Sequence, residues 1–113
     1  MSDIQAGQIR VNVSTLTEIA GKAASQVTGV ESSFEALLRQ ARVMVGGELK
    51  QAQDRIALEE KGVILFLTLK LAGDSCFVEV AREVQRRVRK AIQEELGLLL
   101  HRINVEIHEI EWL

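Results

Sequence analysis

A ten-residue apolar run, VILFLTLKLA at residues 63–72, constrains the fold of this chain more than any other segment. The run is half the length of a bilayer span and contains Thr68 and Lys70, so it is too short and too polar for a membrane helix. Its residues alternate instead, as in a strand with one buried face. That face consists of Val63, Leu65, Leu67, Leu69 and Leu71. We therefore predict a long strand whose leucine face points into the core.

Two large apolar residues, Ile64 and Phe66, lie on the opposite face of this strand, where the neighbouring strands look polar. Near the end of the chain, Ile110 and Trp112 fall on the polar side of the final strand's alternation and can join them. Two accounts of these four residues stay open. Either a helix over residues 34–44 covers them, or they form a surface for self-association or another partner.

The remaining patterns predict the element order β-α-(α)-β-β-α-β. The first half supplies a strand over residues 9–13, a helix capped by Ser14 or Thr15 that ends before Gly29, and a short helix over residues 34–44. Residues 48–53 are ambiguous between helix and loop.

The second half of the chain supplies a β-hairpin, a long helix and a last strand. The hairpin joins residues 55–58 to residues 63–71 through Lys61–Gly62, and the helix runs from 77 to 96, closed by Gly97. The strand then alternates until a bulge or an end near residues 108–109. We expect one α/β domain over residues 1–113, an α+β two-layer sandwich with a four-stranded mixed sheet and helices mainly on one face.

Composition narrows the functional classes. The 113 residues are 47% hydrophobic and 27% charged, which is ordinary for a globular domain, and the net charge of −2 disfavours nucleic acid as a partner. The single cysteine, Cys76, allows no disulfide within the chain and suits a reducing compartment. The first ten residues lack the pattern of a signal peptide, so we expect a cytoplasmic protein.

No motif for catalysis or cofactor binding is found. The two histidines and the cysteine lie far apart without the spacing of a metal site, and no phosphate loop, nucleophile elbow or dinucleotide fingerprint occurs. The acidic residues form no obvious inward-facing pair for acid–base chemistry. We therefore predict no enzyme, no metal and no cofactor.

The long helix carries a basic strip on its solvent side, composed of Arg82, Arg86, Arg89 and Lys90. Acidic residues accompany it: Glu83 lies three and four residues before Arg86 and Arg87, and Glu94 lies four residues after Lys90. No aromatic residues interleave with the arginines to stack bases. The strip is therefore open to three interpretations: a solvated helix face, a contact for a protein or an anionic lipid, or a nucleic-acid surface.

Three stretches together resemble the alkaline shock protein family of general and envelope stress proteins. They are GQIRVNVSTLTEIAGKAASQVTGV at residues 7–30, EEKGVILFLTLKLAG at residues 59–73, and VAREVQRRVRKAIQEELGLLLHRINVEIHEI at residues 80–110. The chain departs from the family at Ala72–Gly73, where the family tends to have Tyr-Gly with a nearby proline, and in the charged segment 34–53. It is identified as a divergent member.

The resemblance implies a non-enzymatic cytoplasmic protein linked to envelope or general stress, which self-associates and reaches the membrane through an anchor protein. No catalytic residues carry over from the family. Its motif residues look architectural here: Gly29, Val30, Gln85, Val88, Gly97, Asn104 and Val105. Our leading hypothesis is an oligomeric scaffold or adaptor near the envelope. The alternative is a small RNA-binding module that uses the basic strip.

Overall fold

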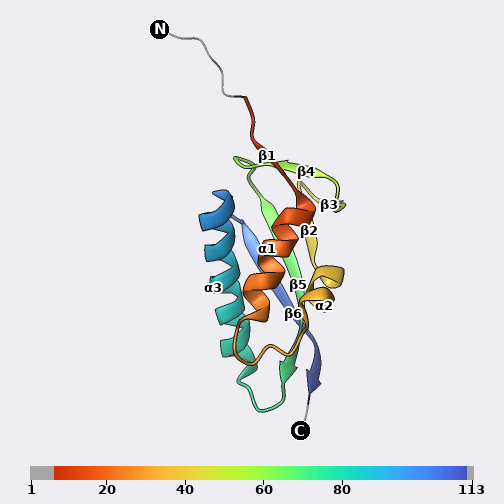
Figure 1. The fold of residues 1–113 in the computed structure, drawn as a ribbon, viewed down its shortest axis with the longest axis vertical. Coiled ribbons are helices and arrows are strands. Elements are labelled where there is room, and N and C mark those ends of the chain that lie inside the picture. Colours follow the sequence, from red (N-terminus) through yellow and green to blue (C-terminus); the bar gives the residue numbers. More distant parts are fainter. Residues whose placement is uncertain (1–6, 112–113) are drawn as a thin grey trace.

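A mixed four-stranded sheet with two helices on one face forms the centre of the protein (Figure 1). The computed structural model describes residues 7–111, with side chains as far as His108. In sheet order the strands are β3 (Glu48–Lys50), β2 (Arg42–Val45), β5 (Val63–Ala72) and β6 (Arg102–Glu111). Strand β5 pairs antiparallel with β2 and parallel with β6. The predicted α+β architecture is confirmed.

The inner face of β5 forms the middle of the core. Its five side chains, Val63, Leu65, Leu67, Leu69 and Leu71, are each at most 1% exposed, as the alternation predicted. Val43 of β2 and Ile103 of β6 extend this buried layer to either side. Burial of one such leucine side chain contributes about 1.5–3 kcal/mol. This row therefore stabilises the fold more than any other single strand face.

Helices α1 (Val13–Ser25) and α3 (Phe77–Leu96) lie side by side and antiparallel over this face (Figure 1). Their buried stripes meet the leucines of β5, and they include Leu16, Ala20 and Ala24 from α1 and Val84, Val88 and Ile92 from α3. The predicted bounds of α3 are confirmed. Gly97 ends the helix in the left-handed conformation, with φ of 73°, and its N–H donates to the Gln93 carbonyl at 2.9 Å.

Helix α1 begins earlier than predicted and uses no side-chain cap. Asn12 occupies the N-cap position without a capping hydrogen bond. The first two N–H groups of the helix donate to backbone carbonyls of a neighbouring loop, Val13 to Asp54 at 2.9 Å and Ser14 to Ala52 at 3.0 Å. Because this loop satisfies the exposed donors, the predicted capping residues are not needed.

The predicted hairpin between residues 55–58 and 63–71 is wrong. Strand β4 (Arg55–Ala57) pairs instead with β1 (Arg10–Asn12) in a separate two-stranded ribbon. The antiparallel neighbour of β5 is β2, most of which lies in the segment predicted as helix, residues 34–44. Buried Val43 explains the difference, because a strand at this position completes the core beside Leu65.

Strands β2 and β3 form the hairpin that the sequence does contain. Gly46 and Gly47 connect them with φ angles of 60° and 81°, and Val45 pairs with Glu48 across the turn. A two-residue turn with both φ angles positive requires glycine or asparagine. The glycine pair therefore turns the chain back along the sheet rather than ending a helix.

Helix α2 (Phe34–Gln40) is shorter than the predicted helix over residues 34–44 and packs at the side of the sheet (Figure 1). Ser33 caps it by accepting the Ala36 N–H at 3.1 Å. Its Phe34 and Leu38 side chains contact α1 at Gly21, where an added Cβ would lie 3.4 Å from both. Its Leu37 is fully buried in the core. Helix α2 thus belongs to the helical layer.

The predicted irregularity near the end of β6 is confirmed. Leu69 pairs with Ile107, but the next residue of β5, Lys70, pairs with Glu109. His108 is therefore the extra residue of a β-bulge, and the alternation of β6 changes phase there.

Gly29 is the glycine whose replacement we expect to be most harmful. Its φ is 99°, and a Cβ there would lie 2.8 Å from Val80 Cγ2 and 2.9 Å from Ser75 Oγ. We predict that Gly29→Ala lowers the free energy of unfolding by about 2–4 kcal/mol, measured by chemical denaturation. Gly46→Ala is the matched control, because its φ is also positive while no atom lies within 4 Å. An equal loss in both variants would contradict the steric explanation.

Candidate interaction surface

The face of the sheet that points away from α1 and α3, here called the outer face, carries a row of apolar side chains. Strand pairing places Leu49, Met44 and Ile64 next to one another across β3, β2 and β5, and Phe66 follows Ile64 along β5. These four residues are here called the apolar patch. None of them belongs to the buried core.

The apolar patch is partly open to solvent. Leu49 is 57% exposed, and Met44, Ile64 and Phe66 are half-buried. The predicted helix over residues 34–44, which one account placed over Ile64 and Phe66, does not form at that length: α2 ends at Gln40 and contacts α1 and the core. Ile110 lies in β6 without a described side chain, and Trp112 lies outside the described residues, so their part in this surface stays a prediction.

Strand β6 adds charges of both signs to the outer face. Arg102 pairs with Ile64, Asn104 with Phe66, and Glu106 with Thr68, so all three β6 residues share this face. Arg102 and Glu106 lie about 13 Å apart along the strand, because each residue advances it by about 3.3 Å. Both are exposed, and within residues 7–108 neither side chain forms a hydrogen bond or ion pair.

Arg42 is also on the outer face, but its charge is engaged. Its Nη1 donates to the carbonyl oxygens of Arg39 and Ala41, both at 2.8 Å. A cation there stabilises the unpaired carbonyls at the end of α2. Arg42 therefore caps the C-terminal end of α2, and its guanidinium is not available for a partner.

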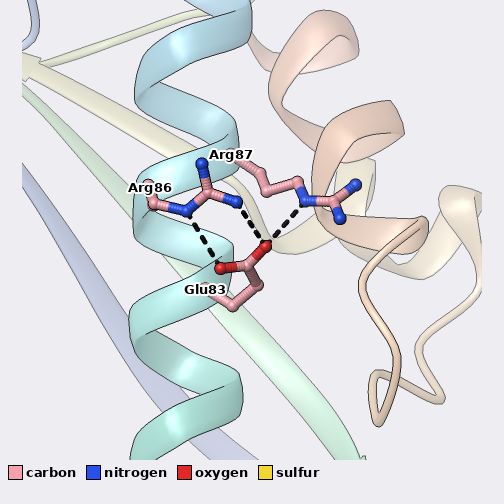
Figure 2. Close-up of polar contacts among 3 residues, drawn as sticks. All are labelled: Glu83, Arg86 and Arg87. Atoms are coloured by element: carbon pink, nitrogen blue, oxygen red, sulfur yellow. Dashed lines mark hydrogen bonds and ion pairs between the residues drawn. The ribbon is translucent and has the colours of Figure 1, made fainter.

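The basic strip of α3 is largely occupied by internal partners. Figure 2 shows the Arg86 and Arg87 guanidinium groups turned toward the Glu83 carboxylate, with Arg86 donating at 3.0 and 2.7 Å and Arg87 at 2.8 Å. Lys90 lies 3.9 Å from Glu94. These are the pairs that the spacing predicted. In the strip, only Arg82 forms no hydrogen bond or ion pair within the described part of the chain.

Arg89, the remaining member of the strip, connects α3 to the start of β6. Its Nη1 donates to the carbonyl oxygen of Leu100, and the neighbouring Gln85 donates to the carbonyl of Ile103 at 2.9 Å. Sequence reasoning grouped Arg89 with the solvent-facing cations. Its acceptor is a backbone oxygen four residues beyond the end of the helix, which no side-chain pattern indicates.

The charges around Glu83 shift its titration strongly. The hydrogen bond from Arg86 and then that from Arg87 stabilise the carboxylate, and they lower the pKa of Glu83 from 4.5 to about 2. Glu83 therefore stays ionised at every physiological pH, and it neutralises much of the positive potential on this side of α3.

The described residues contain no candidate metal site. Within them no group of three His, Cys, Asp or Glu side chains could hold a metal ion, and none of their charged or polar residues is buried. A hollow of about 390 Å³ lies between α2 and β5, and its lining includes Ser33, Arg39 and His108. Among residues 7–111, no helix is both long and apolar enough to span a bilayer.

Comparison with known proteins finds one matching family and one group of solved structures with a similar fold. The model of the alkaline shock protein 23 family, described as having a cell envelope-related function, matches residues 1–112. No curated protein matches the chain. Among solved structures, one MamM CTD variant is 15% identical with a TM-score of 0.51, covering 88% of this chain and 99% of its own. A second MamM CTD variant is 16% identical with a TM-score of 0.50, covering 86% and 92%. This likeness concerns the fold alone.

We predict that the Glu83 carboxyl titrates with a midpoint near pH 2 in a carbon-detected NMR titration. Arg86→Gln should raise this midpoint toward 4.5, and by more than Arg87→Gln, because the Arg86 hydrogen bond has the larger effect. Since the folded pKa is depressed, the pair's contribution to stability is complete above about pH 4.5 and is lost as pH falls through about 2. A wild-type midpoint near 4.5 would show that the three side chains do not meet in solution.

Proposed function

The chain belongs to the alkaline shock protein 23 family, whose description is a cell envelope-related function, and on this basis we propose that it is a self-associating scaffold or adaptor at the envelope. In this proposal the protein performs no catalysis. It assembles with copies of itself and provides binding surfaces for a membrane-anchor or other envelope partner under stress.

The observation that carries the proposal is the apolar patch on the outer face. A soluble domain rarely leaves large apolar side chains together on a sheet face unless another surface covers them. Here α1 and α3 bury only the inner face, and α2 packs at the side. Self-association is the simplest way to remove Met44, Leu49, Ile64 and Phe66 from water.

The overall charge also favours association between copies. A net charge of −2 on 113 residues produces little long-range repulsion between identical chains. Together with the absence of a catalytic or metal-binding cluster among the described residues, this supports a structural role over an enzymatic one.

The alternative, a small RNA-binding module, has weaker support. Binding of phosphates requires available cations, and within the basic strip Arg86 and Lys90 pair with glutamates while Arg89 donates to a backbone carbonyl. Arg82 alone offers too little charge for a phosphate-tracking surface. We expect no RNA affinity above the weak, strongly salt-dependent background of an acidic protein.

We predict that wild-type protein self-associates with increasing concentration in sedimentation-velocity experiments, and that Phe66→Glu weakens this association about 100-fold. A carboxylate in the apolar patch loses hydration at the contact without gaining a partner, and such central positions dominate interface energetics. Circular dichroism should show an intact fold, because Phe66 lies outside the core.

Val78→Glu is the control for this experiment. Val78 is 58% exposed on α3, so the same kind of substitution there should leave association unchanged. Fractionation of cells that produce each variant tests the location: wild type and Val78→Glu should co-sediment with envelope, and Phe66→Glu should do so less. A monomeric wild type, or equal association of all three proteins, would refute the scaffold.

A further inference from the structure

We propose that two copies of the chain pack outer face to outer face about a two-fold axis that crosses the strands near Phe66 and Asn104, so that Arg102 of each copy meets Glu106 of the other. This inference rests on the proposed self-association and specifies its geometry. It concerns the face opposite α1 and α3 and requires no movement of the helices.

The order of charges along β6 points to a second copy as the occupant. On the outer face β6 presents Arg102, then neutral Asn104, then Glu106, at equal spacing. Reversal of the strand direction about Asn104 exchanges the two charged positions and leaves Asn104 opposite itself. Both charges then gain an opposite charge, and the symmetry forms the contact twice.

Two residues of the apolar patch, Ile64 and Phe66, suit the same arrangement. Phe66 pairs with Asn104 and with Arg42 across the sheet, so this row lies at the axis and each of the three residues meets its own equivalent. The Arg42 guanidinium is held by the carbonyl oxygens of Arg39 and Ala41 at the end of α2, which partly offset its charge. Sheets that pack face to face lie about 10 Å apart, and alternate residues along a strand lie about 7 Å apart. Ile64 of one copy is thus within reach of Phe66 of the other. The aromatic rings form the centre of the contact, and the charges form its rim.

A two-fold axis parallel to the strands does not provide this match. If such an axis lay on β6, it would place Arg102 over Arg102 and Glu106 over Glu106. If it lay between β2 and β5, it would place Arg102 over Leu49, because those residues occupy opposite ends of one row. Opposed like charges or an unpaired buried cation are both unfavourable.

The size of the outer face limits the expected affinity of the homodimer. Four strands spaced about 4.8 Å apart, of which only β5 and β6 reach ten residues, give a footprint of at most about 19 by 33 Å. This is below the roughly 800 Å² per partner of typical stable complexes. We therefore expect a reversible dimer with a dissociation constant in the micromolar range or weaker.

Charge reversal tests the arrangement. Arg102→Glu and Glu106→Arg should each weaken the homodimer about tenfold or more, because each opposes like charges twice. Mixing the two variants should restore association to near the wild-type level, since every contact in the mixed dimer again joins opposite charges. The double variant Arg102→Glu/Glu106→Arg should also dimerise like wild type. Sedimentation equilibrium, with one variant fluorescently labelled, measures all four combinations.

Arg82→Glu is the matched control, because Arg82 is exposed on α3 without a partner among the described residues. It changes net charge as Arg102→Glu does, and it should dimerise like wild type. Single variants that dimerise normally, or a mixture that shows no restoration, would overturn the proposed geometry. If Phe66→Glu still abolishes association in that case, the scaffold stands with a different arrangement. A monomeric wild type would refute both.

Discussion

The burial of one face of β5 is the interaction on which the rest of the structure depends. Its inner residues are almost fully buried under α1 and α3, and β2 and β6 extend the same layer on either side. Successive residues of a strand point to opposite faces of the sheet. Because Val63, Leu65 and Leu67 point to the inner face, Ile64 and Phe66 lie on the outer face. The candidate interaction surface is thus a geometric consequence of how the core is built.

Features governed by neighbouring residues could be predicted from the sequence. The alternation of residues 63–72 indicated β5, the helical period and Gly97 indicated both ends of α3, and the change of phase near His108 indicated the bulge. The ion pairs of Glu83 followed from helix spacing alone. In each case the pattern and its physical cause lie within a few residues, so no knowledge of the tertiary structure was required.

Features that depend on distant partners could not be predicted in this way. The neighbour of β5 is decided by which segment buries a side chain beside Leu65, and Val43 does so although the residues before it are helical. The carbonyls of Ala52 and Asp54 replace the side-chain cap of α1, and the Leu100 carbonyl holds Arg89. The alternation of β5 predicted which of its residues lie on each face of the sheet. The location of α2 could not be predicted from the sequence, and this location decides whether the apolar patch is exposed to solvent.

The two charged regions of the molecule, the basic strip and the outer face, differ in whether their charged side chains have partners within the described residues. On α3 the cations meet glutamates of the same helix or backbone carbonyls, so most of the charge there is balanced locally. On the outer face Arg102 and Glu106 share a strand but lie too far apart to meet each other. Because strand geometry keeps these two opposite charges apart, each is solvated unless another molecule contacts this face. Their position beside the apolar patch is why we propose the outer face, and not the basic strip, as the surface for self-association.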